Sequence, residues 1–547
     1  MADYSFISVG IDFGVSTSGV SYCIMPSNQA GNPVTSILLR NGSSHMEPSE
    51  LGASGSWGSG IHAHEKKFDL FKLSLLHCDD LPRDDRHPER LTMIMQALDK
   101  IHGAGFRGVD IGALPRGGRR AIDVCDLHFV FGIPAVWNEV ATLRMRQAID
   151  SSGILTSVGR PVTMDFVVEP EAAAIAIIPQ LCQSDSLMIG HTIVICDCGG
   201  GTVDVISYKV TSLSPIGVKE CVPGEGRLLG SMFLRPTFEA WIKTEVARHL
   251  GADREVIDIA RLDSEIEVAW TAAHGVAADA LGTWSHWMRI WHIGGDQLPP
   301  LQLAGTDVIG GLRILTDDIM ALTETQVQSV AKHLGCEPHR IVVVGGFGCN
   351  RFLQSEFVRR FGQEKMCFTN LEGMHAVKNG AALTGLWQKL DSITTAGAWQ
   401  GQANARKAVT VRSRVSPYSY GFWDGTKSEN EITWFIRKGD EIAVGSPLQI
   451  VLPARAFKRQ GNVQGRDHAY VRIYRVPMTM PMVSTTEGTP GLTELCHVRC
   501  FEASLLDLRA QVQLGIQMKG RLVKFDVIYQ GVTNPKRLFE VHSLIAA

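Results

Sequence analysis

Two stretches of the chain share one pattern of apolar positions interrupted by a short turn of small residues. The first runs from Ser5 to Met25, with its turn at Val15–Gly19. The second runs from Thr192 to Val210, with its turn at Gly199–Thr202. Runs rich in β-branched and aromatic residues that flank such a turn are typical of a β-hairpin. The pattern therefore predicts a hairpin in each stretch.

The two predicted hairpins align with each other at a constant offset of 185 residues. At that offset an aspartate, a glycine and a threonine coincide, namely Asp12 with Asp197, Gly14 with Gly199, and Thr17 with Thr202. An internal repeat of this kind indicates two related lobes. Each lobe would present a carboxylate at a strand end, followed by a turn with exposed backbone N–H groups.

This arrangement suits the binding of a nucleotide. Glycine lets the backbone approach a phosphate closely, and consecutive turn N–H groups form a nest for anions. A carboxylate beside the phosphates can hold Mg²⁺ through its water molecules, because Mg²⁺ gives up water reluctantly. A single hairpin of this type is equally well explained as a stable turn. Two aligned hairpins favour the interpretation that they grip a triphosphate from both sides.

A third element has the same character. Arg340–Val344 has the composition of a buried strand, and Arg351–Arg360 has that of a helix. Gly345 and Gly346 lie between them, which suits a close approach of the backbone to a ligand. By itself a glycine-rich turn between a strand and a helix is weak evidence.

Composition narrows the possibilities further. The 547 residues correspond to about three or four folding units. With a net charge of −3, no basic field indicates binding to nucleic acid, and no apolar run is long enough to suggest a membrane span. Twelve cysteines without a C-x-x-C pair, and no signal peptide, predict reduced thiols and a cytoplasmic location. Cys196 and Cys198, which flank Asp197, are interpreted as core residues rather than metal ligands.

Several motifs, in order, resemble the actin–hexokinase–DnaK superfamily of ATPases, and within it a DnaK-type heat-shock chaperone relative. The resemblance covers about Ser5 to Leu390. Its motifs are two phosphate motifs (Gly10–Gly14 and Ile195–Asp204), an adenosine motif (Val344–Asn350), two interlobe connecting motifs (Val168–Ala176 and Ala376–Ala382) and the stretch Gly132–Asn138.

The resemblance implies an α/β protein with a two-lobed actin-like ATPase fold, built from duplicated ribonuclease-H-like lobes. Lobe I would span residues 1–190 and lobe II residues 191–395, with a helix near 375–390 completing lobe I. Phe71–Leu73, Trp434–Asp440 and details of the adenosine motif are similar to a divergent eukaryotic branch that lacks the standard peptide-binding domain and its lid. Residues 396–547 have an alternating pattern, which predicts a β-rich C-terminal region.

The resemblance also implies roles for individual residues. Asp12 and Asp197 would hold hydrated Mg²⁺, Lys72 would neutralise the transferring phosphate, and Glu169 and Asp204 would order the attacking water. For the carboxylates, the alternative is that they cap turns. The residues that would bind ATP or ADP are Gly14, Ser16, Thr17, Gly199, Gly200, Gly201 and Thr202 at the phosphates, and Gly345, Gly346 and Phe347 at the nucleoside.

One segment departs from the family. A basic pair over the adenine is expected within Arg261–Gly275, but Trp270 and His274 stand there instead. Downstream, Trp284, Trp287 and Trp291 fall at i, i+3 and i+7, which predicts one stripe of a helix, buried against the lobe. A reshaped pocket or an exposed surface for a partner is the alternative.

These expectations lead to three hypotheses about function. The first is an ATP-binding, slowly hydrolysing, chaperone-like protein in which the nucleotide state is coupled to closure of the lobes. The second is an enzyme of small-molecule metabolism that reuses the fold, and the third is a pseudo-ATPase scaffold. The expected partners are a nucleotide and either a protein client or a small organic substrate, with neither nucleic acid nor a membrane.

Overall fold

The computed structural model describes a large part of the chain. The described residues are 4–26, 40–41, 46–49, 51–52, 67–68, 72, 75, 126–137, 139–152, 154–156, 162–184, 187–251, 256–274, 285–393, 409–423, 432–445, 448–463, 466–477, 492–500, 511–519, 522–529 and 539–543. They form a mixed α/β protein with several sheets.

The first sheet is built on the N-terminal hairpin. Its strand order is β3-β2-β1-β7-β8, with β1 antiparallel to β2 and parallel to β7. The strands are β1 (Tyr4–Phe13), β2 (Thr17–Pro26), β3 (Arg40–Asn41), β7 (Asp126–Ile133) and β8 (Thr163–Val168), and β4 (Glu47–Pro48) pairs with β2. The predicted hairpin is confirmed, with Asp12 opposite Gly19.

The second sheet repeats this strand order. Its order is β16-β15-β9-β10-β11-β17-β20, and β9 is antiparallel to β10 and parallel to β15. The strands are β9 (Thr192–Cys198), β10 (Val203–Leu213), β11 (Ile216–Glu220), β15 (Arg340–Val344), β16 (Met366–Phe368), β17 (Val409–Val415) and β20 (Glu441–Ala443), and β12 (Glu225–Arg227) pairs with β10. The second predicted hairpin is confirmed too. The sequence repeat is therefore also a repeat of strand order.

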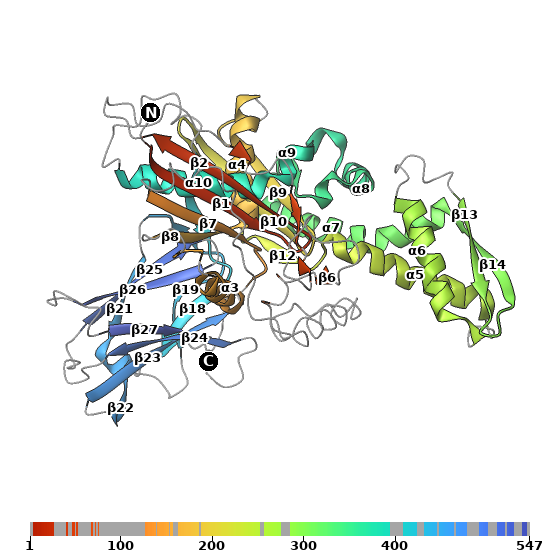
Figure 1. Cartoon of the computed structure of the whole chain (residues 1–547). Coiled ribbons are helices and arrows are strands. Elements are labelled where there is room, and N and C mark those ends of the chain that lie inside the picture. The colour runs from red at the N-terminus through yellow and green to blue at the C-terminus, as the bar shows by residue number, and fades with distance from the viewer. Residues whose placement is uncertain are drawn as a thin grey trace.

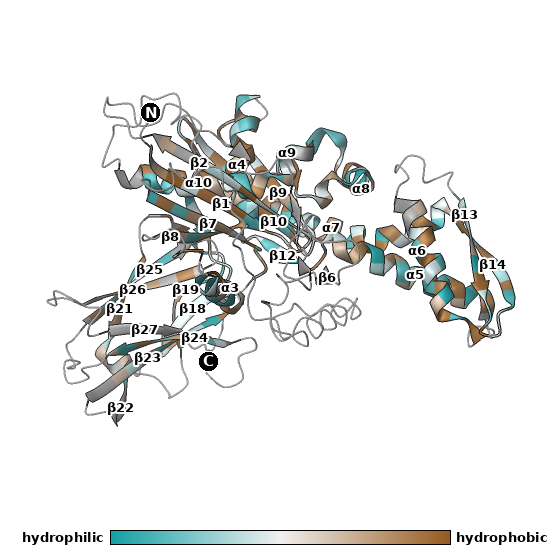
Figure 2. Ribbon diagram, viewed as in Figure 1, coloured by the Kyte–Doolittle hydropathy of each residue, from teal (hydrophilic) through white to brown (hydrophobic). Residues whose placement is uncertain are grey.

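Two helices pack between the sheets. Helices α4 (Glu169–Gln183) and α10 (Ala376–Ile393) contact each other, and α10 also lies against β1, β2 and β7 (Figure 1). Glu169 and Glu171 stand in the first turn of α4 with a proline between them, as expected at the positive end of the helix dipole. Both helices contribute buried side chains to one apolar core with strands of both sheets, and Figure 2 shows hydrophobic residues along these elements.

A helical extension projects from the second sheet (Figure 1). It consists of α5 (Leu234–Leu250), α6 (Ile259–His274), the strand pair β13 (Ser285–Trp291) and β14 (Gln297–Ala304), and the long helix α7 (Gly305–Leu334). Helices α8 (Arg351–Phe361) and α9 (Asn370–Met374) follow β15 and β16, while α3 (Glu139–Ser151) follows β7.

The predicted tryptophan helix is wrong. Trp287 and Trp291 lie on the strand β13, and Trp284 lies outside the described residues. Met288 and Ile290 are fully buried, whereas the Trp287 side chain is 58% exposed. The period of two set by Met288 and Ile290 decides the structure, and pairing with β14 satisfies the backbone, so spacing of the tryptophans alone is misleading.

The described residues after Ile393 form strands and no α-helix. One sheet has the order β19-β18-β23-β24-β27, with β22 paired to β23, and a second has the order β21-β25-β26. The strands are β18 (Ser419–Trp423), β19 (Ile432–Ile436), β21 (Leu448–Pro453), β22 (Lys458–Val463), β23 (Arg466–Val476), β24 (Thr493–Cys500), β25 (Gln511–Lys519), β26 (Leu522–Tyr529) and β27 (Phe539–Ser543). They enclose their own apolar core. The expected β-rich character is confirmed, but β17 and β20 belong to the second sheet.

Candidate functional site

A cavity of about 530 Å³ lies where the two hairpin turns approach each other. Every residue that the sequence analysis assigned to the site lines this cavity except Asp204. The predicted lining residues are Asp12, Gly14, Ser16, Thr17, Lys72, Glu169, Asp197, Gly199, Gly200, Gly201, Thr202, Gly345, Gly346 and Phe347. Residues separated by more than 300 positions in the sequence thus share one space.

The two turns are in direct contact. A Cβ atom added to Gly200 would lie 2.2 Å from Ser16 Oγ, and one added to Gly201 would lie 2.5 Å from Val15 Cγ2. Glycine is therefore required here by the close approach of the other hairpin rather than by its own φ angle. Any residue with a side chain at Gly200 would push the two turns apart.

Neighbouring segments hold both turns through their carbonyl groups. Ser49 donates from its backbone N to the Ser16 carbonyl at 2.9 Å and from its Oγ to the Gly14 carbonyl at 2.8 Å. In the second turn, Ser231 N donates to Gly199 O at 3.1 Å, and Met232 N donates to Gly200 O at 2.9 Å. These bonds hold the turns through their carbonyl groups, and of the turn N–H groups, which would contact an anion, that of Gly199 donates to Thr202 O at 3.0 Å.

Two aspartates occupy equivalent places at the ends of β1 and β9. Burial and the nearby Glu169 carboxylate raise the pKa of Asp12 to about 7, although Lys72 and Lys378 act in the opposite direction. Burial, followed by the charges of Glu169, Asp204 and Asp12, raises the pKa of Asp197 well above its usual range. The carboxylates therefore repel one another, and a bound cation would relieve that repulsion.

Glu169 and Lys72 form a buried ion pair at the wall of the cavity. Their side chains are only 10% and 3% exposed. Glu169 is the first residue of α4, and Lys72 Nζ also lies 5.7 Å from the centre of the Trp137 ring. The pair thus fixes one carboxylate and one ammonium group beside Asp12, although 97 residues separate the two partners in the chain.

Asp204 lies outside the cavity. It pairs with Asp197 across β9 and β10, is 1% exposed, and accepts a hydrogen bond from Val136 N at 3.1 Å. A Cβ atom on Gly226 would lie 2.1 Å from its Oδ1 atom. This placement suits a structural role behind the second hairpin rather than direct contact with a ligand.

Gly345 is the most constrained of the predicted nucleoside residues. Its φ is +85°, and a Cβ atom would meet Cys198 O at 2.4 Å and Asp197 Oδ1 at 2.6 Å. Both observations require glycine. Asn350 then caps α8 by accepting a hydrogen bond from Leu353 N at 3.0 Å. The glycine therefore lets the turn after β15 close over the end of β9.

Sequence reasoning missed several lining residues. They come from the start of α5, from α9, from the first turn of α10 and from short connections, and they are Val15, Met46, Pro134, Ser231, Leu234, Cys349, Asn350, Met374 and Val377. Most are apolar or small, so nothing in their residue type marks them as ligand contacts. Trp270, which stands where the family resemblance leads one to expect a basic residue over the adenine, lines the cavity as well.

Arg261, on α6, and Arg289, on β13, do not line the cavity. Arg289 binds Glu265, with 2.7 Å between Nη2 and Oε1, and Arg261 Cζ lies 5.0 Å from the centre of the Trp291 ring. The His274 side chain lies outside the described residues. Among the residues that the structure describes, the cavity has no basic side chain from α5 or α6.

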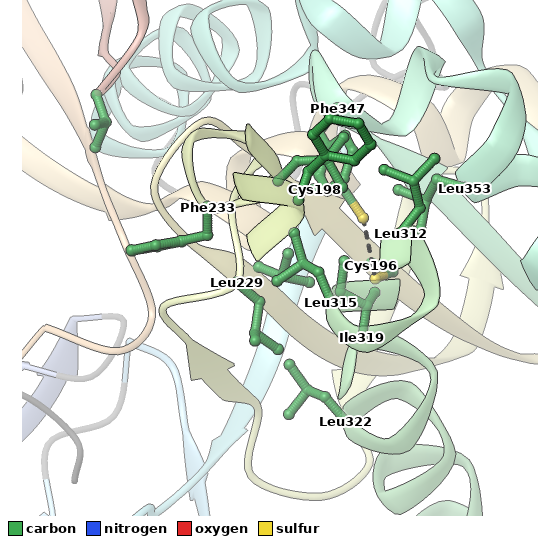
Figure 3. Close-up of a cluster of buried hydrophobic side chains, with 14 of the residues drawn as sticks. Cys196, Cys198, Leu229, Phe233, Leu312, Leu315, Ile319, Leu322, Phe347 and Leu353 are labelled. Atoms are coloured by element: carbon green, nitrogen blue, oxygen red, sulfur yellow. Dashed lines mark hydrogen bonds between the residues drawn. The ribbon is translucent and has the colours of Figure 1, made fainter. Parts of the chain in front are cut away.

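The two cysteines that flank Asp197 are core residues, as predicted. Cys196 and Cys198 are fully buried, with 3.6 Å between their sulfur atoms. Figure 3 shows them beside Phe347 and the leucines of α7. Their neighbours form an apolar layer beneath β9, which supports the strand that ends in the cavity.

The described residues contain no group of three or more His, Cys, Asp or Glu side chains arranged to hold a metal ion directly. In the same part of the chain, no helix has the length and apolar character needed to cross a membrane. Comparison with models of protein families, and with curated proteins, yields no match.

Proposed function

We propose that the chain is a nucleotide-binding protein of the actin-like, two-lobed ATPase type, which binds ATP and hydrolyses it slowly. One observation carries the proposal: two hairpin turns with matching aspartate, glycine and threonine residues meet at one cavity. Backbone N–H groups of such turns suit the phosphates of a triphosphate gripped from both sides. Because each turn belongs to a different sheet, nucleotide binding would also couple the positions of the two sheets, as in a chaperone-like ATPase.

The donor set fits Mg²⁺ held through water. Asp12 and Asp197 present carboxylate oxygens to the cavity, and burial, followed by neighbouring negative charges, raises the pKa of both groups, so a divalent cation is electrostatically favoured. When bound, Mg²⁺ would offset the charge of the phosphates. The two aspartates would hold the ion through its water molecules.

The chain's own residues would supply the rest of the chemistry. Glu169 can accept a hydrogen bond from the attacking water, while Lys72 holds its carboxylate in place and places a positive charge near the phosphates. Phosphoryl transfer depends chiefly on positioning and charge neutralisation, so this set is sufficient for slow hydrolysis.

Isothermal titration with Mg·ATP tests the proposal. The wild-type chain should bind, and Asp197→Asn should weaken binding at least about tenfold, which corresponds to about 1.4 kcal/mol. Asp296→Asn, an exposed aspartate in the β13–β14 turn, is the matched control and should bind as the wild type does. Absence of binding by the folded wild-type chain would refute the proposal.

A small-molecule enzyme is the second candidate. The observation that favours it is the part of the cavity lined by Leu234, Trp270 and Met374, which suits an organic group. Phosphate release measured with Mg·ATP alone separates the two candidates. Steady hydrolysis without an added acceptor supports the ATPase, whereas ATP consumption only when an organic acceptor is added supports the enzyme.

A further inference from the structure

The described residues that line the cavity divide by element into a charged half and an uncharged half, which meet where Gly345 lies against Asp197. Among the described residues, the charged side chains that line it come from β1, β9, the start of α4 and the Lys72 segment, and they are Asp12, Lys72, Glu169 and Asp197. The lining residues contributed by α5, α6, α9 and the connection after β15 carry no charge. They are Ser231, Leu234, Trp270, Gly345, Gly346, Phe347, Cys349, Asn350 and Met374. The phosphates of a nucleotide suit the first half, and a flat apolar group suits the second.

Trp270 is the more exposed of the two described aromatic side chains in the uncharged half. Phe347, the other aromatic residue there, is only 6% exposed, whereas Trp270 is half-buried. Leu262, Ile266 and Ala269 bury the inner face of α6, which anchors the helix that carries the indole. The Phe238 ring supports Trp270 from behind, with 5.3 Å between ring centres and 57° between ring planes.

Two of the polar side-chain atoms in this half are already used within the protein. Asn350 Oδ1 accepts the capping hydrogen bond from Leu353 N, and Cys349 Sγ donates to Gly345 O at 3.8 Å. Ser231 lies beside the turn at Gly199–Thr202, because its backbone N donates a hydrogen bond to Gly199 O. Reading one base against another requires hydrogen bonds to its edge, and stacking does not provide them.

We propose that Trp270 is the stacking platform for the base of the bound nucleotide, and that the site takes purine nucleoside triphosphates without distinguishing adenine from guanine. This inference rests on the proposed function and specifies its ligand class. Stacking of a base on an aromatic side chain is worth about 5- to 150-fold in affinity, or about 1–3 kcal/mol. Backbone contacts to the phosphates are the same for both purines.

The test compares three ligands, Mg·ATP, Mg·GTP and Mg·tripolyphosphate, which has no base. In the wild-type chain, ATP and GTP should bind within about threefold of each other, and tripolyphosphate should bind about 5- to 150-fold more weakly. Trp270→Leu should lower the affinity for both nucleotides to near that of tripolyphosphate, and it should leave tripolyphosphate binding unchanged. Trp270→Phe should keep part of the difference.

Trp241→Leu is the matched control. Trp241 lies on α5, with its ring centre 5.7 Å from that of Phe238, and it does not line the cavity, so nucleotide affinities should not change. The inference is overturned if Trp270→Leu binds ATP as the wild type does, if ATP is preferred over GTP more than about 30-fold, or if tripolyphosphate binds as tightly as ATP. Binding of tripolyphosphate in that last case leaves the phosphate site standing. Failure of all three ligands to bind the folded wild type overturns the proposed function and the inference together.

Discussion

The ion pair between Glu171 and Arg414 links the helix that begins in the cavity to a strand near the C-terminal sheets. Glu171 lies two residues after Glu169 on α4, and Arg414 lies on β17. The two side chains are bidentate, with 2.5 Å between Nη2 and Oε1 and 2.9 Å between Nε and Oε2. They are only 5% and 13% exposed. Burial by itself would lower the pKa of Arg414, but the Glu171 charge and hydrogen bonds raise it.

We expect Arg414→Met to lower the free energy of unfolding by about 3–5 kcal/mol, because it leaves the Glu171 carboxylate buried without its partner. Glu171→Met should cost about the same for the converse reason. The double variant should cost far less than the sum of the two, since it removes both charges of the pair and leaves only Glu220, whose charge also acts on Arg414. The coupling energy of the cycle should therefore exceed about 2 kcal/mol.

Guanidinium unfolding followed by tryptophan fluorescence measures these free energies, compared at equal denaturant slope. The control is Arg146→Met on α3. Arg146 pairs with Asp150, but both side chains are about half exposed (45% and 50%), so the loss should be below about 0.5 kcal/mol. Additive effects of the two buried substitutions, or a loss below about 1 kcal/mol for each, would show that the pair does not hold α4 to β17.

Three further predictions concern the cavity. Because the pKa of Asp12 is raised from 3.8 to about 7 in the folded chain, the folded state binds more protons than the unfolded state between pH 4 and 7. As the pH rises across that window, the free energy of unfolding should therefore fall by about 2–4 kcal/mol relative to that of Asp12→Asn. The lower value applies because water in the cavity weakens the effect of burial. Parallel pH profiles of the two chains would contradict this. Gly200→Val should weaken Mg·ATP binding at least about tenfold, since a Cβ atom there overlaps Ser16, whereas Gly310→Ala, which has open space around it, should not; equal affinities in a titration would show that the turn does not contact phosphate. Lys378 is fully buried, its Nζ atom has no hydrogen-bond partner among the described residues, and burial lowers its pKa more than the Asp12 charge raises it. Lys378→Met should therefore raise the unfolding free energy at pH 6 by about 1–2 kcal/mol, and a loss of stability in the same denaturation assay would show that attraction to Asp12 outweighs the cost of burial.

Much of the local structure could be predicted from the sequence. Both hairpins, the strand at Arg340–Val344, the helix after it and the strands near the C-terminus follow from short-range patterns of apolar, small and β-branched residues. The buried positions of Cys196 and Cys198 follow from their place in an apolar strand. The hairpins depend on hydrogen bonds between residues that are close in sequence, and the burial of the cysteines depends on the apolar character of their own strand. Local composition encodes both.

The sequence pattern was misleading where the helical spacing of the tryptophans competed with the strand period of their neighbours. The spacing of Trp287 and Trp291 is compatible with a helix, but burial of Met288 and Ile290 and pairing with β14 make the segment a strand. Asp204 matches a family motif, yet the pairing of β10 with β9 places it behind Asp197 and outside the cavity.

The distances within the site were decided by tertiary structure alone. Only packing of the sheets brings Ser16 against Gly200, Lys72 against Glu169 and Arg414 against Glu171. Tertiary packing also places Trp270 in the lining of the cavity, because α6 packs into the apolar core that the second sheet shares. A sequence determines which residues can form strands, turns and ion pairs. Which of them meet depends on how buried surfaces fit together across hundreds of residues, and no local pattern contains that information.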